Sequence, residues 1–107
     1  MQNDIQIIEL KGNLTEIENQ ILATINNYES YKNQNLIFDG SENQNLTLTS
    51  LKLFQEISKT HKKSKKSLVI VAQDIDFNKV SSKLNVVPTI QEAMDLIEME
   101  EMIRELK

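Results

Sequence analysis

Cysteine is absent from the 107 residues of the chain, and histidine occurs once. Without cysteine the chain can form neither a disulfide nor a thiolate nucleophile, and the lone His61 excludes the common histidine-rich metal sites. Two glycines argue against a glycine-rich phosphate loop. The sequence also offers no Ser-His-Asp set and no pair of carboxylates isolated in apolar surroundings. We therefore expect a protein that is not an enzyme and that uses no cofactor or metal.

An excess of positive charge is also missing, because the net charge is −4 and the isoelectric point is near 5.0. Binding to a nucleic-acid backbone needs a basic face, so we expect no nucleic-acid partner. Apolar runs stay far below the roughly 18 residues that span a bilayer. Residues 1–4 carry neither the basic nor the apolar region of a signal peptide. These features predict a cytoplasmic protein without a membrane partner.

The remaining composition is that of an ordinary globular protein. Hydrophobic residues make up 39% of the chain and charged residues 26%, a balance that allows a folded core and argues against disorder. A chain of this length forms one domain, which we assign to residues 1–107.

Three apolar segments predict strands, at residues 5–10, 35–39 and 67–72. The third is continuously apolar, as expected of a strand covered on both faces, so we place it centrally and parallel to the second. Val86 and Val87, which precede Pro88, predict a short edge strand.

Apolar residues at helical spacing predict four helices between and after these strands. A capping box of Asn13 and Glu16 opens the first helix, and Thr89 with Glu92 opens the last. The expected helices cover residues 14–30, a segment from Leu51 that ends in the basic run 59–66, a short helix capped by Asp74 that contains Phe77, Val80 and Leu84, and residues 89–106.

The resulting order is strand, helix, strand, helix, strand, helix, short strand, helix. This alternation predicts an α/β fold with a small, mixed but mostly parallel sheet of about four strands and helices packed against it.

Hydroxyl side chains gather where the second helix is expected to begin. Thr47, Thr49 and Ser50 follow the strand at residues 35–39, at the end of a parallel strand where ligands and partners meet α/β proteins. Each of the three is either a helix N-cap, the commoner role of Ser and Thr at such a position, or a phosphate acceptor.

The last predicted helix carries a second apolar stripe beyond the one that a core needs. Leu96, Met99, Ile103 and Leu106 recur at heptad-like spacing, with glutamates between them. The stripe either packs back over the sheet edge or serves as a contact surface for a partner, including a second copy of the chain.

The basic run 59–66 similarly has two interpretations: a binding site for nucleic acid or anionic lipid, or a solvated helix end, which its lack of aromatic residues favours.

Three segments together resemble the STAS domain of bacterial anti-sigma factor antagonists. Residues 10–14 (Leu-Lys-Gly-Asn-Leu) are similar to the family's second strand and glycine turn, and residues 36–41 (Leu-Ile-Phe-Asp-Gly-Ser) to its central strand ending in Asp-x-Ser. Residues 84–93 resemble the closing segment, in which a Thr and a Glu-Ala pair open the last helix. The family's first strand is reduced here to residues 1–4 at most.

The resemblance implies a STAS-like fold and regulation by partner switching. In that family the unmodified domain binds an anti-sigma factor that is also a kinase, and phosphorylation on the loop before the second helix reverses the binding. Carried over to this chain, the resemblance implies Thr49, with Thr47 and Ser50 beside it, as the phosphoacceptor. Partner contacts are expected at Asp39, Ser41, Leu48 and Leu51, and along the stripe of Leu96, Met99, Ile103 and Leu106.

The phosphorylation loop departs from the family pattern. Where the family has Asp, Ser, Ser or Thr, Gly and Leu in succession, residues 47–51 read Thr-Leu-Thr-Ser-Leu, so the Asp and the Gly are both missing. The sequence therefore predicts a non-enzymatic regulatory protein that acts through an anti-sigma factor or a related kinase-like protein. The alternative is a STAS-like scaffold or homodimer subunit that is not phosphorylated and uses the C-terminal stripe.

Overall fold

The structure, a computed structural model that describes residues 4–106, contains a four-stranded sheet in the order β1-β2-β3-β4. Its strands are β1 (Ile5–Glu9), β2 (Asn35–Gly40), β3 (Leu68–Ala72) and β4 (Val86–Val87). Each strand pairs in parallel with the next. The expected α/β class is confirmed, whereas the expected mixed sheet is wrong for the described residues. The predicted remnant of a first strand falls mostly on residues 1–3, outside the described part.

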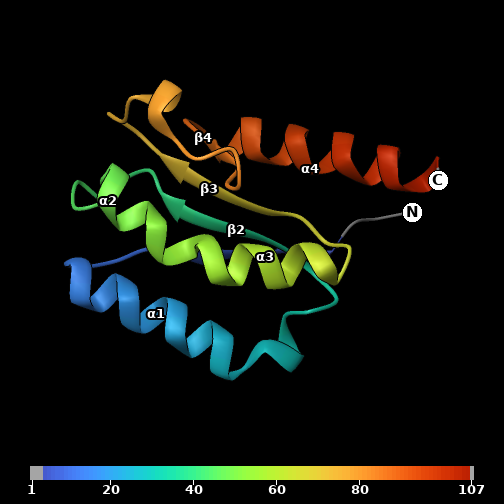
Figure 1. The fold of residues 1–107 in the computed structure, drawn as a ribbon, viewed down its shortest axis with the longest axis horizontal. Coiled ribbons are helices and arrows are strands. Elements are labelled where there is room, and N and C mark those ends of the chain that lie inside the picture. The colour runs from blue at the N-terminus through green and yellow to red at the C-terminus, as the bar shows by residue number, and fades with distance from the viewer. Residues whose placement is uncertain (1–3, 107) are drawn as a thin grey trace.

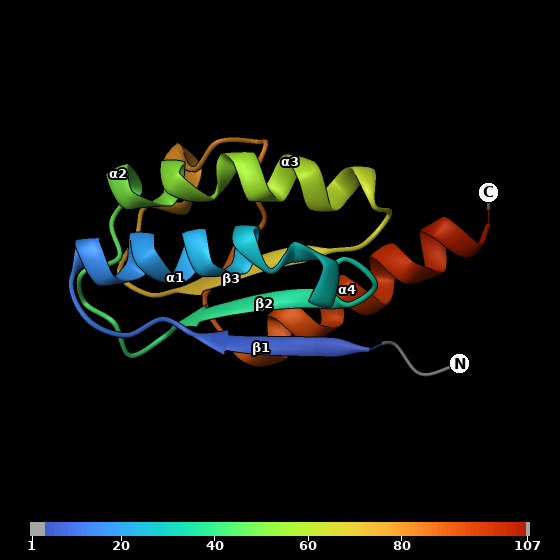
Figure 2. The same ribbon diagram turned by 90° about the horizontal axis from the view of Figure 1, so that it is seen from below.

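The helices form two layers, one on each face of the sheet (Figures 1 and 2). One layer holds α1 (Leu14–Asn26) and a continuous helical segment made of α2 (Leu48–Leu51), the 3₁₀ turn η2 (Lys52–Phe54) and α3 (Gln55–Lys63). The other layer holds α4 (Ile90–Glu105) alone, antiparallel to the strands. Two further 3₁₀ turns are η1 (Tyr28–Ser30) and η3 (Phe77–Lys79).

The short helix expected after β3 is the least accurate sequence prediction. Only η3 forms there, and its cap is Asp76, whose side chain accepts a hydrogen bond from the amide of Asn78. Asp74 instead adopts a left-handed backbone with φ of 56°, which cannot begin a right-handed helix. Phe77, expected on a core-facing stripe, is exposed as a result.

Other helix boundaries differ by a few residues. The first helix ends at Asn26 and continues as the separate turn η1, and the second begins at Leu48, three residues before the expected Leu51. The capping box of Asn13 and Glu16 and the N-cap at Thr89 are both confirmed. The edge strand at Val86 and Val87 is also confirmed.

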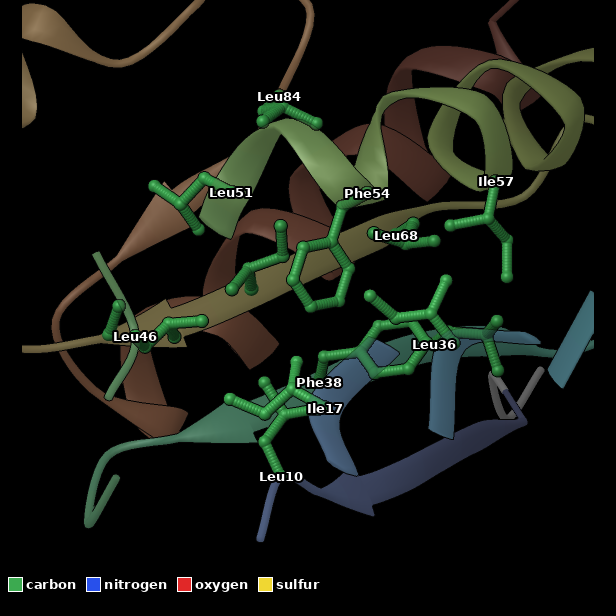
Figure 3. Close-up of a cluster of buried hydrophobic side chains, with 13 residues drawn as sticks. Leu10, Ile17, Leu36, Phe38, Leu46, Leu51, Phe54, Ile57, Leu68 and Leu84 are labelled. Carbon is green, nitrogen blue, oxygen red and sulfur yellow. The ribbon is translucent and has the colours of Figure 1, made fainter. Parts of the chain in front are cut away.

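The larger core lies between the sheet and the layer of α1 and α3 (Figure 3). Phe38 from β2 and Phe54 from η2 meet edge to face at its centre, with ring centroids 5.1 Å apart. Leu10, Ile17 and Leu36 close the cluster around Phe38. The large apolar side chains on this face hold β2 and the helical segment 48–63 in fixed relative positions.

The smaller core lies between the sheet and α4. It consists of five buried residues, with partly buried neighbours around them: Ile37, Val69, Val71, Ala93 and Ile97. Because neighbouring residues of a strand point to opposite faces, Ile37 contributes to this core while Leu36 and Phe38 contribute to the other. All five residues of β3 are buried, which confirms that β3 is covered on both faces.

Candidate protein-binding edge of the sheet

The carboxyl ends of β2 and β3 open onto a cleft of about 690 Å³. The loop at residues 41–46 and the first turn of α2 form one wall, and residues 73–76 form the other. A second cleft, of about 440 Å³, lies between the same loop and the end of β1. We refer to residues 41–49 and 73–76 as the carboxyl-edge site. Its position is where parallel sheets generally meet ligands and partners.

Side-chain hydrogen bonds fix the loop at residues 41–46. The Asp39 carboxylate accepts from the amide of Ser41 at 3.0 Å. Asn43 Nδ2 donates to the carbonyls of Leu10 and Gly12 at 3.1 and 3.2 Å, and Asn45 Nδ2 donates to Gly12 at 2.9 Å. These bonds connect the loop after β2 to the loop after β1, so the edge of the sheet is held as one surface.

Gly40 allows this loop to pack closely on the sheet. A Cβ atom at this position would lie 2.5 Å from the Leu46 side chain and 3.0 Å from the carbonyl oxygen of Val71. Leu46 is buried and belongs to the larger core. The Asp-Gly-Ser sequence therefore turns the chain at the end of β2 and brings Leu46 back against the strands.

Two of the three hydroxyl residues are occupied by capping. Thr47 is the N-cap of α2, and its Oγ1 accepts from the amide of Ser50 at 3.3 Å. Ser50 Oγ in turn accepts from the amide of Thr47 at 2.7 Å and donates to the Thr47 carbonyl at 2.8 Å. Ser50 is only 2% exposed, so a kinase cannot reach it in this fold, which corrects its place among the candidate phosphoacceptors.

Thr47 and Thr49 are both exposed, but only Thr49 has a side chain that takes no part in capping. It is exposed, lines the larger cleft, and forms no side-chain hydrogen bond with any residue from 4 to 106. The charged side chains that the described residues contribute to this cleft are all carboxylates: Glu42, Asp74 and Asp76. On its other side Thr49 lines a smaller depression of about 230 Å³ together with Lys52 and Lys79, so its accessible hydroxyl lies between acidic and basic side chains.

The other expected partner contacts fall into two groups. Ser41 and Leu48 are half-buried in the carboxyl-edge site, and Asp39 is half-buried beside it in the second cleft, so a partner can touch all three. Leu51, in contrast, is 2% exposed and packs inside the larger core, so its assignment as a partner contact is corrected.

The apolar stripe of α4 is open to solvent along its second half. Met99, Ile103 and Leu106 are exposed, Leu106 by 86%, whereas Leu96 is half-buried against the smaller core. Met102, which the heptad spacing did not include, is exposed beside them. Figure 2 shows the last turns of α4 extending past the amino ends of the strands. Of the two interpretations of the stripe, packing over the sheet edge holds for Leu96 only, and Met99, Ile103 and Leu106 are left open to contact.

His61 has a structural role that sequence reasoning missed. It is fully buried, its Nε2 donates to the carbonyl of Gln34 at 2.7 Å, and its Nδ1 is hydrogen-bonded at 2.7 Å to the Tyr28 hydroxyl, which is also hydrogen-bonded to Ser64 Oγ at 2.9 Å. In the neutral ring Nε2 carries the proton that is donated to Gln34, and Nδ1 accepts from Tyr28. Burial lowers the pKa of His61, and the charges of Lys66 and Arg104 lower it further against the opposing bond to Gln34.

Residues 4–106 contain no cluster of His, Asp and Glu side chains suited to hold a metal ion. None of the helices in that part of the chain has the length and apolar character needed to span a membrane. Comparisons with protein-family models, curated proteins and solved structures gave no match. The resemblance to the STAS family therefore stays a prediction.

Proposed function

We propose that the chain is a STAS-like, non-enzymatic regulatory protein of the anti-sigma factor antagonist type. It binds an anti-sigma factor, or a related kinase-like protein, at the carboxyl-edge site. The observation that carries this proposal is Thr49, an exposed hydroxyl on the first turn of α2, directly after the loop that follows β2. This is the position at which the family resemblance places the phosphorylated residue.

The order of the elements supports the proposal. Parallel strands alternate with helices from β1 to α2, η3 stands in place of a third crossover helix, and α4 closes the chain on the other face of the sheet. The sequence similarities at residues 10–14, 36–41 and 84–93 fall on the turn between β1 and α1, on β2 with its turn, and around β4 with the start of α4. The positions of the second and third segments support the proposal.

The fixed loop is a physical reason to expect protein binding. Asn43 and Asn45 hold the loop after β2 against the loop after β1, so little conformational entropy is lost when a partner docks there. The half-buried Leu48 supplies an apolar contact between the exposed Thr47 and Thr49. An open, preorganised surface suits a protein partner better than it suits a small substrate, which is bound in a more enclosed pocket.

Phosphorylation of Thr49 would act on this surface through desolvation. A phosphate adds about −1.5 to −2 charges at neutral pH. Glu42, Asp74 and Asp76 line the cleft on one side of Thr49, and Lys52 and Lys79 lie along the smaller depression on its other side, so the phosphate would change the charge of a surface that already carries both signs. A partner that buries Leu48 would then have to desolvate the neighbouring phosphate. Phosphorylation of Thr49 would therefore weaken the complex.

The test is partner capture from a native bacterial lysate with Thr49→Ala and Thr49→Glu variants. Wild type and Thr49→Ala should capture a kinase-like ATPase. The amount that Thr49→Glu captures should be at least tenfold smaller. Thr60→Glu is the matched control, because Thr60 is also exposed but lies on α3, away from the carboxyl edge. Equal capture by both glutamate variants, together with unmodified Thr47 and Thr49 in mass spectra of the native protein, would exclude phosphate switching.

The exposed stripe of α4 favours a second candidate function, a STAS-like scaffold or homodimer subunit that is not phosphorylated. Four large apolar side chains stand in solvent on two successive turns: Met99, Met102, Ile103 and Leu106. Contiguous apolar surface of this kind marks a protein contact more often than scattered single residues do. A second copy of α4 would supply a matching stripe.

Sedimentation equilibrium separates this candidate from the first. A homodimer through α4 should dissociate at least tenfold more readily in a Met99→Lys/Ile103→Lys variant. Leu22→Lys is the control, because Leu22 and Ile103 are both 48% exposed and Leu22 lies on α1. A monomer at high micromolar concentration would remove the homodimer and leave the carboxyl-edge proposal intact.

A further inference from the structure

A second concave surface lies at the opposite end of the sheet from Thr49. It is a cleft of about 280 Å³ beside the amino ends of β3 and β4. Separate segments of the chain line it: α3, the residues just before β3, the loop before β4, and the last turns of α4. We call it the basic cleft and define it by Ser58, Lys62, Lys66, Ser82, Lys83 and Arg104.

The basic cleft has the opposite charge from the rest of the molecule. The chain as a whole carries a net charge of −4, yet four cations line this cleft against one carboxylate, that of Glu100. Arg104 is already paired with Glu101. No ion pair between described residues includes Lys62, Lys66 or Lys83. The three lysines less the Glu100 carboxylate leave an excess of two positive charges.

Hydrogen bonds hold one wall of the cleft in place. Ser67, which is 2% exposed, accepts from Arg104 Nη2 at 3.0 Å and donates to Glu100 Oε1 at 2.5 Å. Asn85 Nδ2 donates to the other oxygen of Glu100 at 3.4 Å. Arg104 and Glu100 are therefore positioned in advance. The hydroxyls of Ser58 and Ser82, which make no hydrogen bond among residues 4–106, remain as donors around the opening.

We propose that the basic cleft binds a doubly charged phosphate group, either as inorganic phosphate or as a small phosphate monoester. The excess of two positive charges matches the charge of a phosphate dianion, and Lys, Arg and hydroxyl donors are the groups that bind phosphate oxygens. The volume accommodates a phosphate and a small attached group. The lowered pKa of Glu101, caused first by its bond to Arg104 and assisted by Lys66, agrees with a positive potential here.

The sequence showed only part of this arrangement. Lys62 and Lys66 belong to the basic run at residues 59–66, which is typical of a solvated helix end. Folding adds Lys83 and Arg104 from distant positions in the chain and closes the run into a concave surface. A small anion needs such convergence, whereas nucleic acid needs an extended basic track with stacking residues.

The test is titration of the ¹⁵N-labelled full chain with inorganic phosphate at pH 8 and constant ionic strength, followed by NMR. Amide shifts should saturate at Ser67 and Lys83. Affinity should fall at least tenfold in Lys62→Gln/Lys83→Gln and change less than twofold in Lys59→Gln, a control with an exposed lysine on the same helix but outside the cleft. Shifts that never saturate, equal shifts with chloride, or an equal loss in Lys59→Gln would overturn the proposal.

Adenosine monophosphate and adenosine distinguish the sources of the phosphate. Tighter binding of the monophosphate than of inorganic phosphate assigns the cleft to a phosphate monoester, and the reverse order assigns it to the free ion. Adenosine should not compete, and competition by adenosine would overturn the proposal, as would an affinity for an oligonucleotide that rises with its length. Thr49→Glu should leave the titration unchanged, so failure here and failure of the proposed function are separate results.

Discussion

The two faces of the sheet are covered very differently. On the side of α1 and α3, thirteen buried residues form one cluster around the pair of Phe38 and Phe54. On the side of α4, five buried residues form the core, and the last turns of the helix carry exposed apolar side chains. A fully buried aliphatic or aromatic side chain contributes about 1.5–3 kcal/mol, so the two faces differ greatly in the stability that they supply.

This difference in buried core indicates that one face of the sheet provides stability and the other leaves a surface exposed for contact. The side of α1 and α3 fixes the strands and the loop that carries Thr49, so the carboxyl-edge site is built on the more stable layer. The side of α4 is attached by a few residues and leaves its stripe available. Elements with few buried contacts open more readily than the rest of a domain. Four predictions test this division, in order of decreasing effect.

Truncation of Phe38 should cause the largest loss. Phe38→Ala removes a fully buried ring from the centre of the larger core and should lower the free energy of unfolding by about 3–5 kcal/mol. Urea denaturation, monitored by circular dichroism, measures this loss of stability. A loss below that of Ile97→Ala would contradict the division between the two faces.

Truncation of Ile97 should lower the free energy of unfolding by less than truncation of Phe38, and it should affect mainly α4. Ile97→Ala opens the smaller core, and we expect a loss of about 2–3 kcal/mol. Hydrogen exchange should accelerate in α4 more than in α1, because α4 can separate while the larger core stays closed. Uniform acceleration across both helices would show instead that the two faces unfold as one unit.

Replacement of His61 should change the pH dependence of stability. His61→Gln keeps a donor for the Gln34 carbonyl but removes the ring nitrogen bonded to the Tyr28 hydroxyl, which then keeps only Ser64 Oγ at 2.9 Å, so we expect a loss of about 1–2 kcal/mol at pH 8.

The difference in free energy of unfolding between wild type and His61→Gln should become smaller as the pH falls from about 7 to about 5. The pKa of His61 is lowered in the folded state, so the unfolded chain binds the proton first, near its ordinary pKa of about 6.5, and wild type loses stability on acidification. Denaturation of both proteins across this range measures the effect, and parallel pH profiles would contradict it.

The smallest expected changes in stability are those of alanine substitutions at Thr47 and Thr49, which should differ from each other. Thr47→Ala removes the N-cap of α2 and should cost about 0.5–2 kcal/mol, whereas Thr49→Ala should change stability by less than about 0.5 kcal/mol. The melting temperatures of the two variants provide the comparison. An equal loss for both would mean that Thr49 has a structural role and is not a free acceptor.

Sequence reasoning succeeded where the signal was local. The continuous apolar run of β3, the capping box of Asn13 and Glu16, and the cap at Thr89 were all identified correctly. It failed after β3, where the spacing of Phe77, Val80 and Leu84 suggested a helix, whereas the chain has a left-handed backbone at Asp74 and forms only the turn η3.

The candidate site was only partly predictable. The position of the hydroxyl residues after β2 follows from the turn and helix signals of residues 39–51. The exposure of each hydroxyl residue does not follow from these signals, because Ser50 is turned inward, with its hydroxyl bonded to the Thr47 backbone, while Thr49, one position earlier, is exposed. A three-residue pattern of hydroxyls cannot specify which of them faces solvent.

The sequence by itself determined the α/β class, the order of the elements and most of their caps, because apolar periodicity and capping are interactions between residues close together in the chain. Only the tertiary structure decided that the sheet is wholly parallel over the described residues, that the stripe of α4 is open, and that His61 is buried. It also brought Lys83 and Arg104 to Lys62 and Lys66. These outcomes depend on contacts between segments far apart in the chain, for which a local pattern carries no signal.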